Sequence, residues 1–310
     1  MTDYTIVAFY RFTHLPDFEA RRQPLIDVCT RGDVFGTILL AEEGINGTIA
    51  GPADGIDTVI GHIRTLPGCT ELDLKWSSAD ANPFLRMKVR LKKEIVTMGI
   101  PQIDAASSAG EYVEPEAWND LISDPDVVVI DTRNDYEVGI GTFAGAINPE
   151  TASFRDFPEW LQSQGEDLKQ TKVAMFCTGG IRCEKSTAYA RSLGFKDVFH
   201  LKGGILNYLE KVPQADTMWQ GECFVFDQRV SVGHDLAPGS YDMCHACRTP
   251  LTDADQRSPA YVPGVSCPHC QDERSEDQRK RYLERQRQIE RARARGAKHL
   301  GSAAQLRRAK

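Results

Sequence analysis

The sequence lacks any long apolar run and any stretch typical of a targeting peptide. None of its apolar segments approaches the roughly 20 residues that span a bilayer, so we expect no membrane segment. The first residues show no basic stretch followed by an apolar core. We therefore expect a cytoplasmic protein, whose nine cysteines serve metal binding or thiol chemistry and not disulfides.

Acidic residues are scarce in the last part of the chain. Residues 279–310 hold 12 Lys and Arg against 2 Asp and Glu, whereas residues 1–278 hold 25 against 42, a net charge of −17. An acidic body with a basic tail is typical of a protein that meets a polyanion, and tRNA is the natural candidate. A solvated tail without such a partner is the alternative, and charge alone does not separate the two.

The first hundred residues alternate between strand and helix patterns. We expect strands at 4–12, 36–41, 48–51, 71–76 and 84–92, and helices at 16–30 and 54–65. An Asn46-Gly47 turn is expected to join the second and third strands. This order predicts a ferredoxin-like α+β domain over residues 1–100.

The last of these strands alternates apolar with basic side chains. The apolar set, expected to face the core, is Leu85, Met87, Val89 and Leu91. The basic set on the other face is Arg86, Lys88, Arg90 and Lys92. Aligned cations repel one another unless an anion lies across them, so the basic set is a candidate RNA contact. A solvent-facing sheet surface with acidic neighbours such as Glu94 is the alternative.

A second α/β pattern follows a small, polar segment, residues 101–111, which indicates a linker. Apolar runs at 127–130 and 172–176 are typical of parallel strands buried on both faces. Helices are expected near 153–163 and 184–193, and a further strand at 198–201. The alternation predicts a parallel-sheet α/β domain over residues 112–213.

Cys177 stands where one of these buried strands ends and a helix begins, the edge at which open parallel sheets place functional residues. Arg182 lies at the start of that helix. The anion loop expected between them is Thr178, Gly179, Gly180 and Ile181. The helix end and the cation favour a thiolate, the reactive form of cysteine, so we predict that Cys177 and Arg182 are catalytic. A buried cysteine that only packs is the alternative.

Cys183 directly follows Arg182. We expect its side chain to pack away from the loop interior. The alternative is that it resolves an oxidised Cys177.

Four further cysteines form two C-x2-C pairs separated by 19 residues, the spacing of a two-knuckle zinc site: Cys244, Cys247, Cys267 and Cys270. Four thiolates complete the coordination of a tetrahedral metal ion, so we predict a structural zinc ion within residues 214–273. We expect His245 and His269 not to be ligands. A basic helix and tail are expected over 274–310. The remaining cysteines, expected only to pack, are Cys29, Cys69 and Cys223.

Several segments between residues 112 and 213 resemble the landmarks of a rhodanese domain: Ile130-Asp-Thr-Arg133, Glu137, Gly145-Ala-Ile-Asn148, the Cys177–Arg182 loop, Gly194-Phe and Leu201-Lys-Gly-Gly204. In that pattern Asp131 and Arg133 are structural ties. The wider match adds Glu43-Gly-Ile-Asn-Gly-Thr48, the basic strand ending in Glu94-Ile-Val, the extension of the loop to Lys185 and the C-terminal cysteines. With these, nearly the whole chain resembles the rhodanese-containing tRNA uridine(34) hydroxylases.

This resemblance implies oxygen-dependent conversion of the wobble uridine, in the anticodon region of tRNA, to 5-hydroxyuridine. Cys177 is then the active sulfur, as a thiolate or a persulfide, and molecular oxygen is the co-substrate. Sulfur addition to C6 of uracil would make C5 electron-rich enough to meet an oxidant. The sequence shows no flavin, haem or nicotinamide motif.

Two other functions compete with hydroxylation. The loop alone favours a sulfurtransferase that carries a persulfide on Cys177, possibly to tRNA. A non-catalytic RNA-binding module is the third reading, and the intact Cys177 and Arg182 count against it.

Overall fold

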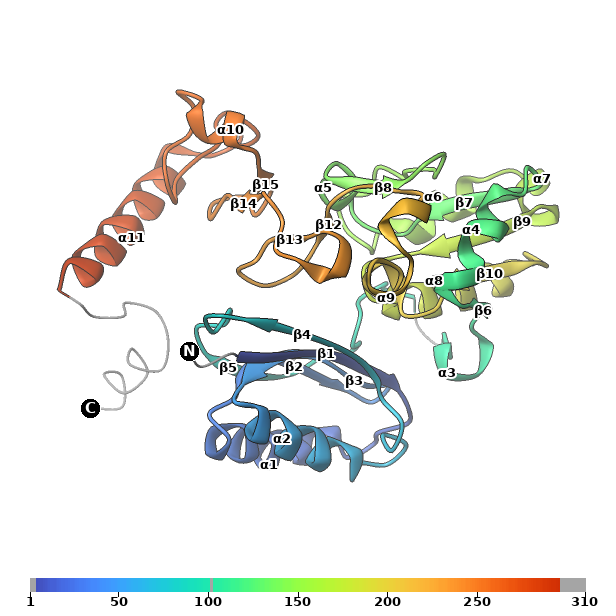
Figure 1. Ribbon diagram of the computed structural model, residues 1–310, viewed down its shortest axis with the longest axis horizontal. Helices are drawn as coiled ribbons and strands as arrows, with labels where there is room; N and C mark the ends of the chain where they lie inside the picture. Colours follow the sequence, from blue (N-terminus) through green and yellow to red (C-terminus); the bar gives the residue numbers. More distant parts are fainter. Residues whose placement is uncertain (1–3, 101–102, 296–310) are drawn as a thin grey trace. The chain divides into compact units, whose positions relative to one another are not determined.

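The structure is a computed structural model that describes residues 4–100 and 103–295 (Figure 1). The chain divides into two units, one of Met1–Val225 with Val232–Ala237, the other of Phe226–Ser231 with Pro238–Lys310. Among the described residues no helix is both long and apolar enough to cross a membrane. The expected basic tail beyond residue 295 lies outside the described residues.

The first unit opens with a five-stranded sheet in the order β4-β1-β3-β2-β5. Its elements are β1 (Tyr4–Phe12), α1 (Phe18–Arg31), β2 (Phe35–Ala41), β3 (Gly44–Gly51), α2 (Ala53–Arg64), β4 (Asp73–Ala79) and β5 (Met87–Leu91). Neighbouring strands are antiparallel except β5, which runs parallel to β2. The β-α-β-β-α-β order of the first six elements confirms the predicted ferredoxin-like fold.

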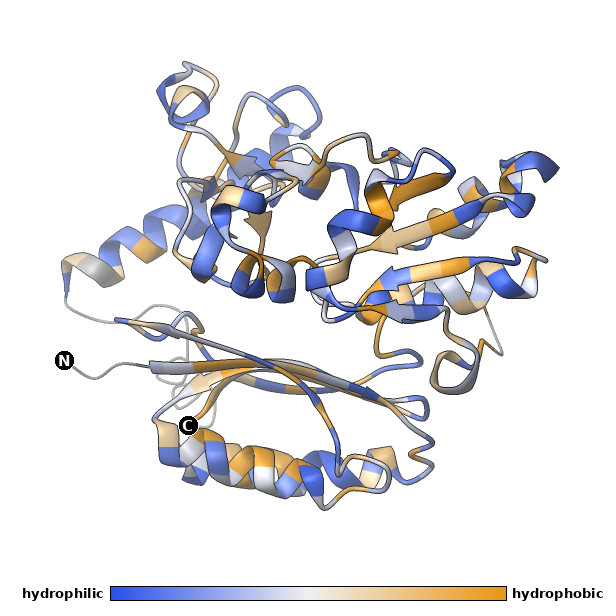
Figure 2. Cartoon of the chain, turned by 45° about the vertical axis from the view of Figure 1, so that its right-hand side comes forward, coloured by the Kyte–Doolittle hydropathy of each residue, from blue (hydrophilic) through white to orange (hydrophobic). Residues whose placement is uncertain are grey.

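The two helices cover one face of this sheet (Figures 1 and 2). Apolar side chains from both helices and from the strands, among them Val7, Leu25 and Ile56, form a single core there. Successive strand residues point to opposite faces, so Tyr10 of β1 lies on the face away from the helices. Asp73 pairs with Tyr10 in the register of β1 and β4, which places Asp73 and Lys75 on that same face.

The expected Asn46-Gly47 turn is wrong. Ala41 pairs with Gly44, so the hairpin turns at Glu42-Glu43, and Asn46 and Gly47 lie inside β3. Both residues instead make close contacts with neighbouring segments. The Asn46 amide donates a hydrogen bond to the Ile95 carbonyl (2.9 Å), and a side chain at Gly47 would meet the ring of Phe9.

The burial expected for the basic strand is only half right. Met87 and Val89 pack against the core, but Leu85 and Leu91 are 46% and 40% exposed. β5 is the edge strand and only five residues long, so Leu85 lies outside it and Leu91 is its last residue.

A parallel sheet in the order β6-β10-β9-β7 forms the rest of the first unit and confirms the predicted rhodanese-type α/β fold. Up to its last strand the elements are α3 (Ala105–Ser108), β6 (Glu111–Val113), α4 (Pro115–Ser123), β7 (Val127–Asp131), α5 (Asp135–Val138), β8 (Gly141–Phe143), α6 (Phe157–Ser163), α7 (Glu166–Gln170), β9 (Lys172–Phe176), α8 (Ile181–Ser192) and β10 (Val198–Leu201). After it come α9 (Gly204–Lys211), η1 (Gln214–Asp216), β11 (Trp219–Gly221), β12 (Cys223–Phe224), β13 (Ser231–Val232) and η2 (His234–Leu236).

The second unit is small. It contains the antiparallel pair β14 (Asp242–Met243) and β15 (Pro250–Leu251), then α10 (Asp253–Arg257) and α11 (Glu276–Ala294). Its core consists mainly of cysteines, with Leu251 buried among them. The helix predicted from residue 274 is therefore present as α11.

Lys185 of α8 ties the two sheets of the first unit together. Its ammonium group lies 2.8 Å from a Glu43 carboxylate oxygen and 2.5 Å from one of Glu94, and it also donates to the Val96 carbonyl (3.1 Å). The lysine side chain is 1% exposed. Glu43 also accepts a hydrogen bond from the Ile95 N–H (2.6 Å). Both carboxylates therefore bond to the lysine and to backbone N–H groups of the segment that follows β5.

Replacing Lys185 with Met should destabilise the first unit by about 3 kcal/mol, because the two carboxylates lose their buried partner. Chemical unfolding would measure this. Lys169→Met is the matched control, since Lys169 pairs with an 81%-exposed Glu166 and its loss should change the free energy of unfolding little. Equal stability of the two variants would contradict the role assigned to Lys185.

Candidate active site and metal site

The Cys177 loop connects the end of β9 to the start of α8, as the sequence predicts. Cys177 has no solvent exposure, and the Gly180 N–H donates a hydrogen bond to its sulfur (3.1 Å). Gly180 adopts a φ of +96°, which favours glycine and turns that amide inward. Gly204, the first residue of α9, lies so close that a side chain there would come within 2.4 Å of the Cys177 carbonyl oxygen.

The surroundings of Cys177 favour its thiolate. Burial opposes ionisation, but a hydrogen bond from the Cys183 thiol, the charge of Arg182 and the N–H groups of Cys183 and Gly180 outweigh it and lower the pKa of Cys177. The pKa of Cys183 moves the opposite way, well above its ordinary value, because of burial and the adjacent Cys177 sulfur. The proton of this pair therefore resides on Cys183.

Cys183 packs in an apolar core, as expected. The direction of its side chain differs from the expectation, because its thiol interacts with the Cys177 sulfur and lies 3.7 Å from the Thr132 hydroxyl. The reason is the short loop: the Cys183 N–H bonds to the Gly180 carbonyl (3.0 Å), so the first turn of α8 brings its side chain back over Cys177.

Arg182 is held by a carboxylate within its own domain. Its two terminal nitrogens lie 2.7 Å from the two oxygens of Glu137, and Arg182 and Glu137 are both almost fully buried. The Thr178 hydroxyl lies 3.2 Å from one of those nitrogens. Arg182 thus fixes the loop and supplies positive charge beside Cys177, while its terminal nitrogens bond to Glu137.

Asp131 and Arg133 form a separate buried pair at the end of β7. The Arg133 guanidinium donates to both oxygens of Asp131, at 2.9 and 2.6 Å, and both side chains are fully buried. Arg133 also reaches the carbonyls of Glu137 and Gly141. These contacts fit the structural role that the resemblance implies for the two residues.

Sequence reasoning missed a second group of side chains beside the loop. The Tyr10 hydroxyl of β1 donates to Glu184 of α8 (2.7 Å), and Tyr112 also bonds to Glu184. Burial, opposed by the tyrosine bonds, raises the pKa of Glu184 to about 7. A Cβ built on Gly180 would lie 3.0 Å from the Tyr10 hydroxyl, so the tyrosine rests against the loop. No spacing signal could reveal this, because Tyr10 and Glu184 are 174 positions apart.

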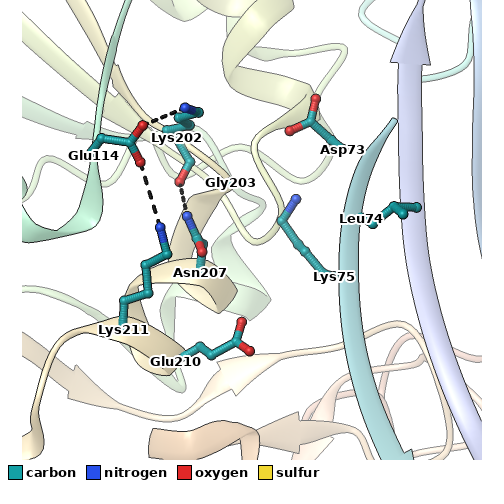
Figure 3. A pocket seen from close by; sticks show the side chains of 9 residues that line it. All are labelled: Asp73, Leu74, Lys75, Glu114, Lys202, Gly203, Asn207, Glu210 and Lys211. Atoms are coloured by element: carbon teal, nitrogen blue, oxygen red, sulfur yellow. Dashed lines mark hydrogen bonds and ion pairs between the residues drawn. The ribbon is translucent and has the colours of Figure 1, made fainter. Parts of the chain in front are cut away.

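A polar pocket of about 230 Å³ opens next to this group (Figure 3). Lys75 and Asp73 reach it from β4, and Asn207 and Lys211 from α9 (Figure 3). The other lining residues are Leu74, Glu114, Lys202, Gly203 and Glu210. Lys202 and Lys211 pair with Glu114, whereas Lys75 lies over the Tyr10 ring, and burial lowers the pKa of Lys75. Gly203 connects the pocket to the loop, since its Cα would lie 3.5 Å from a Cβ on Gly180.

The four C-terminal cysteines converge in the second unit. All four sulfurs, of Cys244, Cys247, Cys267 and Cys270, lie within 4.8 Å of one another. The Cys267 sulfur is 3.7 Å from those of Cys247 and Cys270. A tetrahedral ion with metal–sulfur bonds of about 2.3 Å would separate its ligands by about 3.8 Å, so the residues fit such an ion. His269 instead pairs with Asp255 (3.3 Å).

The remaining cysteines lie in apolar cores, as expected. Cys29 and Cys69 belong to the core of the N-terminal sheet and Cys223 to that of the rhodanese-type sheet.

Comparison with known proteins covers both sheets of the first unit. Residues 4–95 match a family model described as a UPF0176 acylphosphatase-like domain, and residues 114–211 match the rhodanese-like domain. A tRNA uridine(34) hydroxylase of Acaryochloris marina is 59% identical over 302 residues, 97% of each chain. Those of Gluconobacter oxydans and Mesorhizobium japonicum are each 60% identical and cover 96% of both chains.

The chain belongs to the tRNA uridine(34) hydroxylase family. This confirms the resemblance seen in the sequence. Three of the segments that carry the resemblance meet in space, because Glu43, Glu94 and Lys185 form the tie between the two sheets.

The geometry predicts that Cys177 is ionised at neutral pH. The ultraviolet absorbance of thiolate, taken as wild type minus Cys177→Ser, should persist at neutral pH and disappear as the pH falls through the lowered pKa. Cys183→Ala removes a hydrogen-bond donor and should move that transition to higher pH. A wild-type midpoint near the ordinary value of about 8.5 would contradict the assignment.

Proposed function

We propose that this protein hydroxylates uridine 34 of tRNA at C5, with Cys177 as the sulfur nucleophile and molecular oxygen as co-substrate. The observation that carries the proposal is the stabilised Cys177 thiolate at the end of a parallel strand, in a chain whose relatives are named for this reaction. Cytoplasmic location follows from the substrate, because tRNA acts there.

The chemistry begins with addition of the sulfur to C6 of uracil. This breaks the C5–C6 π bond and places electron density on C5, which forms a bond to one atom of molecular oxygen. The O–O bond then breaks, and two electrons from a thiol reductant take the other oxygen atom to water. Loss of the C5 proton and departure of the sulfur restore the ring. Glu184 is the candidate to take up that proton, because its pKa of about 7 lets it exchange a proton near neutrality. It also bonds to Tyr10, which rests against the cysteine loop.

The pocket lined by Lys75 and Asn207 is the candidate site for the nucleotide. It adjoins the loop through Gly203, and its lining offers both donors and acceptors to a polar base or a phosphate. Cys177 itself has no exposed surface, so the loop or the side chains over it must move before a base can reach the sulfur.

Further RNA contacts are proposed for the edge strand β5 and its flanks. Arg86, Arg90 and Lys92 are exposed, and Lys88, half-buried, shares their face of the strand. The basic helix α11 is the second candidate, since most of its side chains are exposed and it carries many arginines. Each of the two is proposed to contact the tRNA backbone.

The runner-up is persulfide transfer from Cys177. The same lowered pKa would favour a persulfide anion there, and the rhodanese-like fold is compatible with it. The two functions leave different nucleosides in tRNA, 5-hydroxyuridine or a thiolated base.

Nucleoside mass spectrometry of tRNA separates them. Cells lacking the protein should lose 5-hydroxyuridine, wild type should restore it, and Cys177→Ala should not. Cys69→Ala, a buried thiol of the N-terminal core, is the matched control and should restore it. Loss of a thiolated base would favour persulfide transfer, and unchanged tRNA would reject both functions.

We also infer that the four-cysteine site holds a structural zinc ion. Four thiolates complete its coordination and leave no position for water, and the small core around Leu251 offers little else to hold the second unit together.

Metal analysis of the purified chain should give one zinc per molecule. Cys247→Ser should lose the ion and loosen the second unit, detected as faster proteolysis after residue 238. His269→Ala is the control and should retain the zinc, because that ring pairs with Asp255. A full zinc content in Cys247→Ser would contradict the site.

A further inference from the structure

We propose that Cys177 and Cys183 act as a dithiol that gives two electrons to oxygen during hydroxylation and ends each turnover as a disulfide. This deepens the proposed function and rests on it. Cys183 then becomes a second catalytic residue, reduced again by an external dithiol before the next turnover.

Cys183 interacts with the Cys177 sulfur through its thiol and through its backbone N–H. The Cys183 thiol donates a hydrogen bond to the Cys177 sulfur, and both residues are fully buried. Three further contacts fix the arrangement. The Cys183 N–H bonds to Gly180, the Thr132 hydroxyl lies 3.7 Å from the Cys183 sulfur, and Thr132 itself bonds to the Phe176 carbonyl (3.0 Å). Cys183 is therefore held facing the reactive sulfur in the resting state.

The electron count of the reaction requires such a donor. Hydroxylation by molecular oxygen places one oxygen atom on C5 and must reduce the other to water, which takes two electrons. Two thiols that join as a disulfide supply two electrons and two protons. The sum is uridine, oxygen and two thiols giving 5-hydroxyuridine, water and one disulfide, with every atom accounted for.

The order of bond changes follows from the two roles of Cys177. While its sulfur is bonded to C6, oxygen adds at C5, and the outer oxygen passes to Cys183 as a sulfenic acid when the O–O bond breaks. The C5 proton then leaves and Cys177 departs from C6 as a thiolate. That thiolate attacks the Cys183 sulfur, forms the S–S bond and releases the oxygen as water.

The asymmetry of the pair suits this sequence. Cys177 is the nucleophile that must add and later attack, whereas Cys183 keeps its proton until oxygen arrives. The guanidinium of Arg182 bonds to Glu137 through both terminal nitrogens. The cation that favours the thiolate is therefore directed at Glu137 and does not lie between the two sulfurs.

A single-turnover experiment tests the proposal. Reduced wild type, freed of reductant and mixed with tRNA and oxygen, should form one equivalent of 5-hydroxyuridine per chain and then stop, and dithiothreitol should restart it. Trypsin cuts after Lys172, Arg182 and Lys185, so the expected disulfide joins peptides 173–182 and 183–185. Cys183→Ser, which keeps a small polar side chain, should lose the linked peptide and the turnover. Cys69→Ser should behave as wild type.

Two results would overturn the dithiol. One is repeated turnover by wild type without reductant while both thiols remain free; the other is a normal rate from Cys183→Ser. A measurement without tRNA keeps this separate from the proposed function: one equivalent of hydrogen peroxide should link the same two peptides. Formation of 5-hydroxyuridine without the linked peptides rejects the dithiol but is consistent with the proposed hydroxylase function. Linkage without any 5-hydroxyuridine supports the dithiol and rejects the proposed substrate.

Discussion

The buried ion pairs of Lys185 are the constraint on which the rest of the first unit depends. One ammonium group on α8 holds Glu43, at the hairpin of the N-terminal sheet, and Glu94, just beyond its edge strand. Since α8 begins at the cysteine loop, the same helix that presents Cys177 also fixes where β1 and β4 lie. This tie and the hydrogen bond from Tyr10 to Glu184 both join the N-terminal sheet to α8, beside the cysteine loop.

Helix α8 is unusual in burying polar side chains along its length. A burial of this kind is tolerated when each polar group has a partner. Arg182 has Glu137, Glu184 has Tyr10, and the Thr187 hydroxyl accepts from the Gly110 N–H (2.9 Å). A helix with an apolar stripe would pack equally well, but it would not specify which surface of the N-terminal sheet it meets.

Much of the fold and the centre of the site can be predicted from the sequence. Strand and helix periodicities locate both sheets, and the position of Cys177 after a buried strand identifies the reactive loop. Two of the failures share one cause, which is that contacts between distant segments leave no local pattern. Asn46 bonds to Ile95 instead of turning the chain, and Glu184 is buried with a hydrogen bond from Tyr10, 174 positions away. The direction of the Cys183 side chain was predicted wrongly for a different reason. It depends on how tightly the glycine loop closes, which residue types alone do not determine.

The complete burial of Cys177 also has a protective consequence. A stable thiolate reacts readily with peroxides, and exposed sulfurs of this kind are lost to over-oxidation. Here the sulfur is shielded while the enzyme is idle, and it would become reachable only when the loop is opened. If RNA binding causes that opening, the docking of the correct nucleic acid licenses the chemistry, and selectivity would reside in the free energy of opening as much as in recognition of the base.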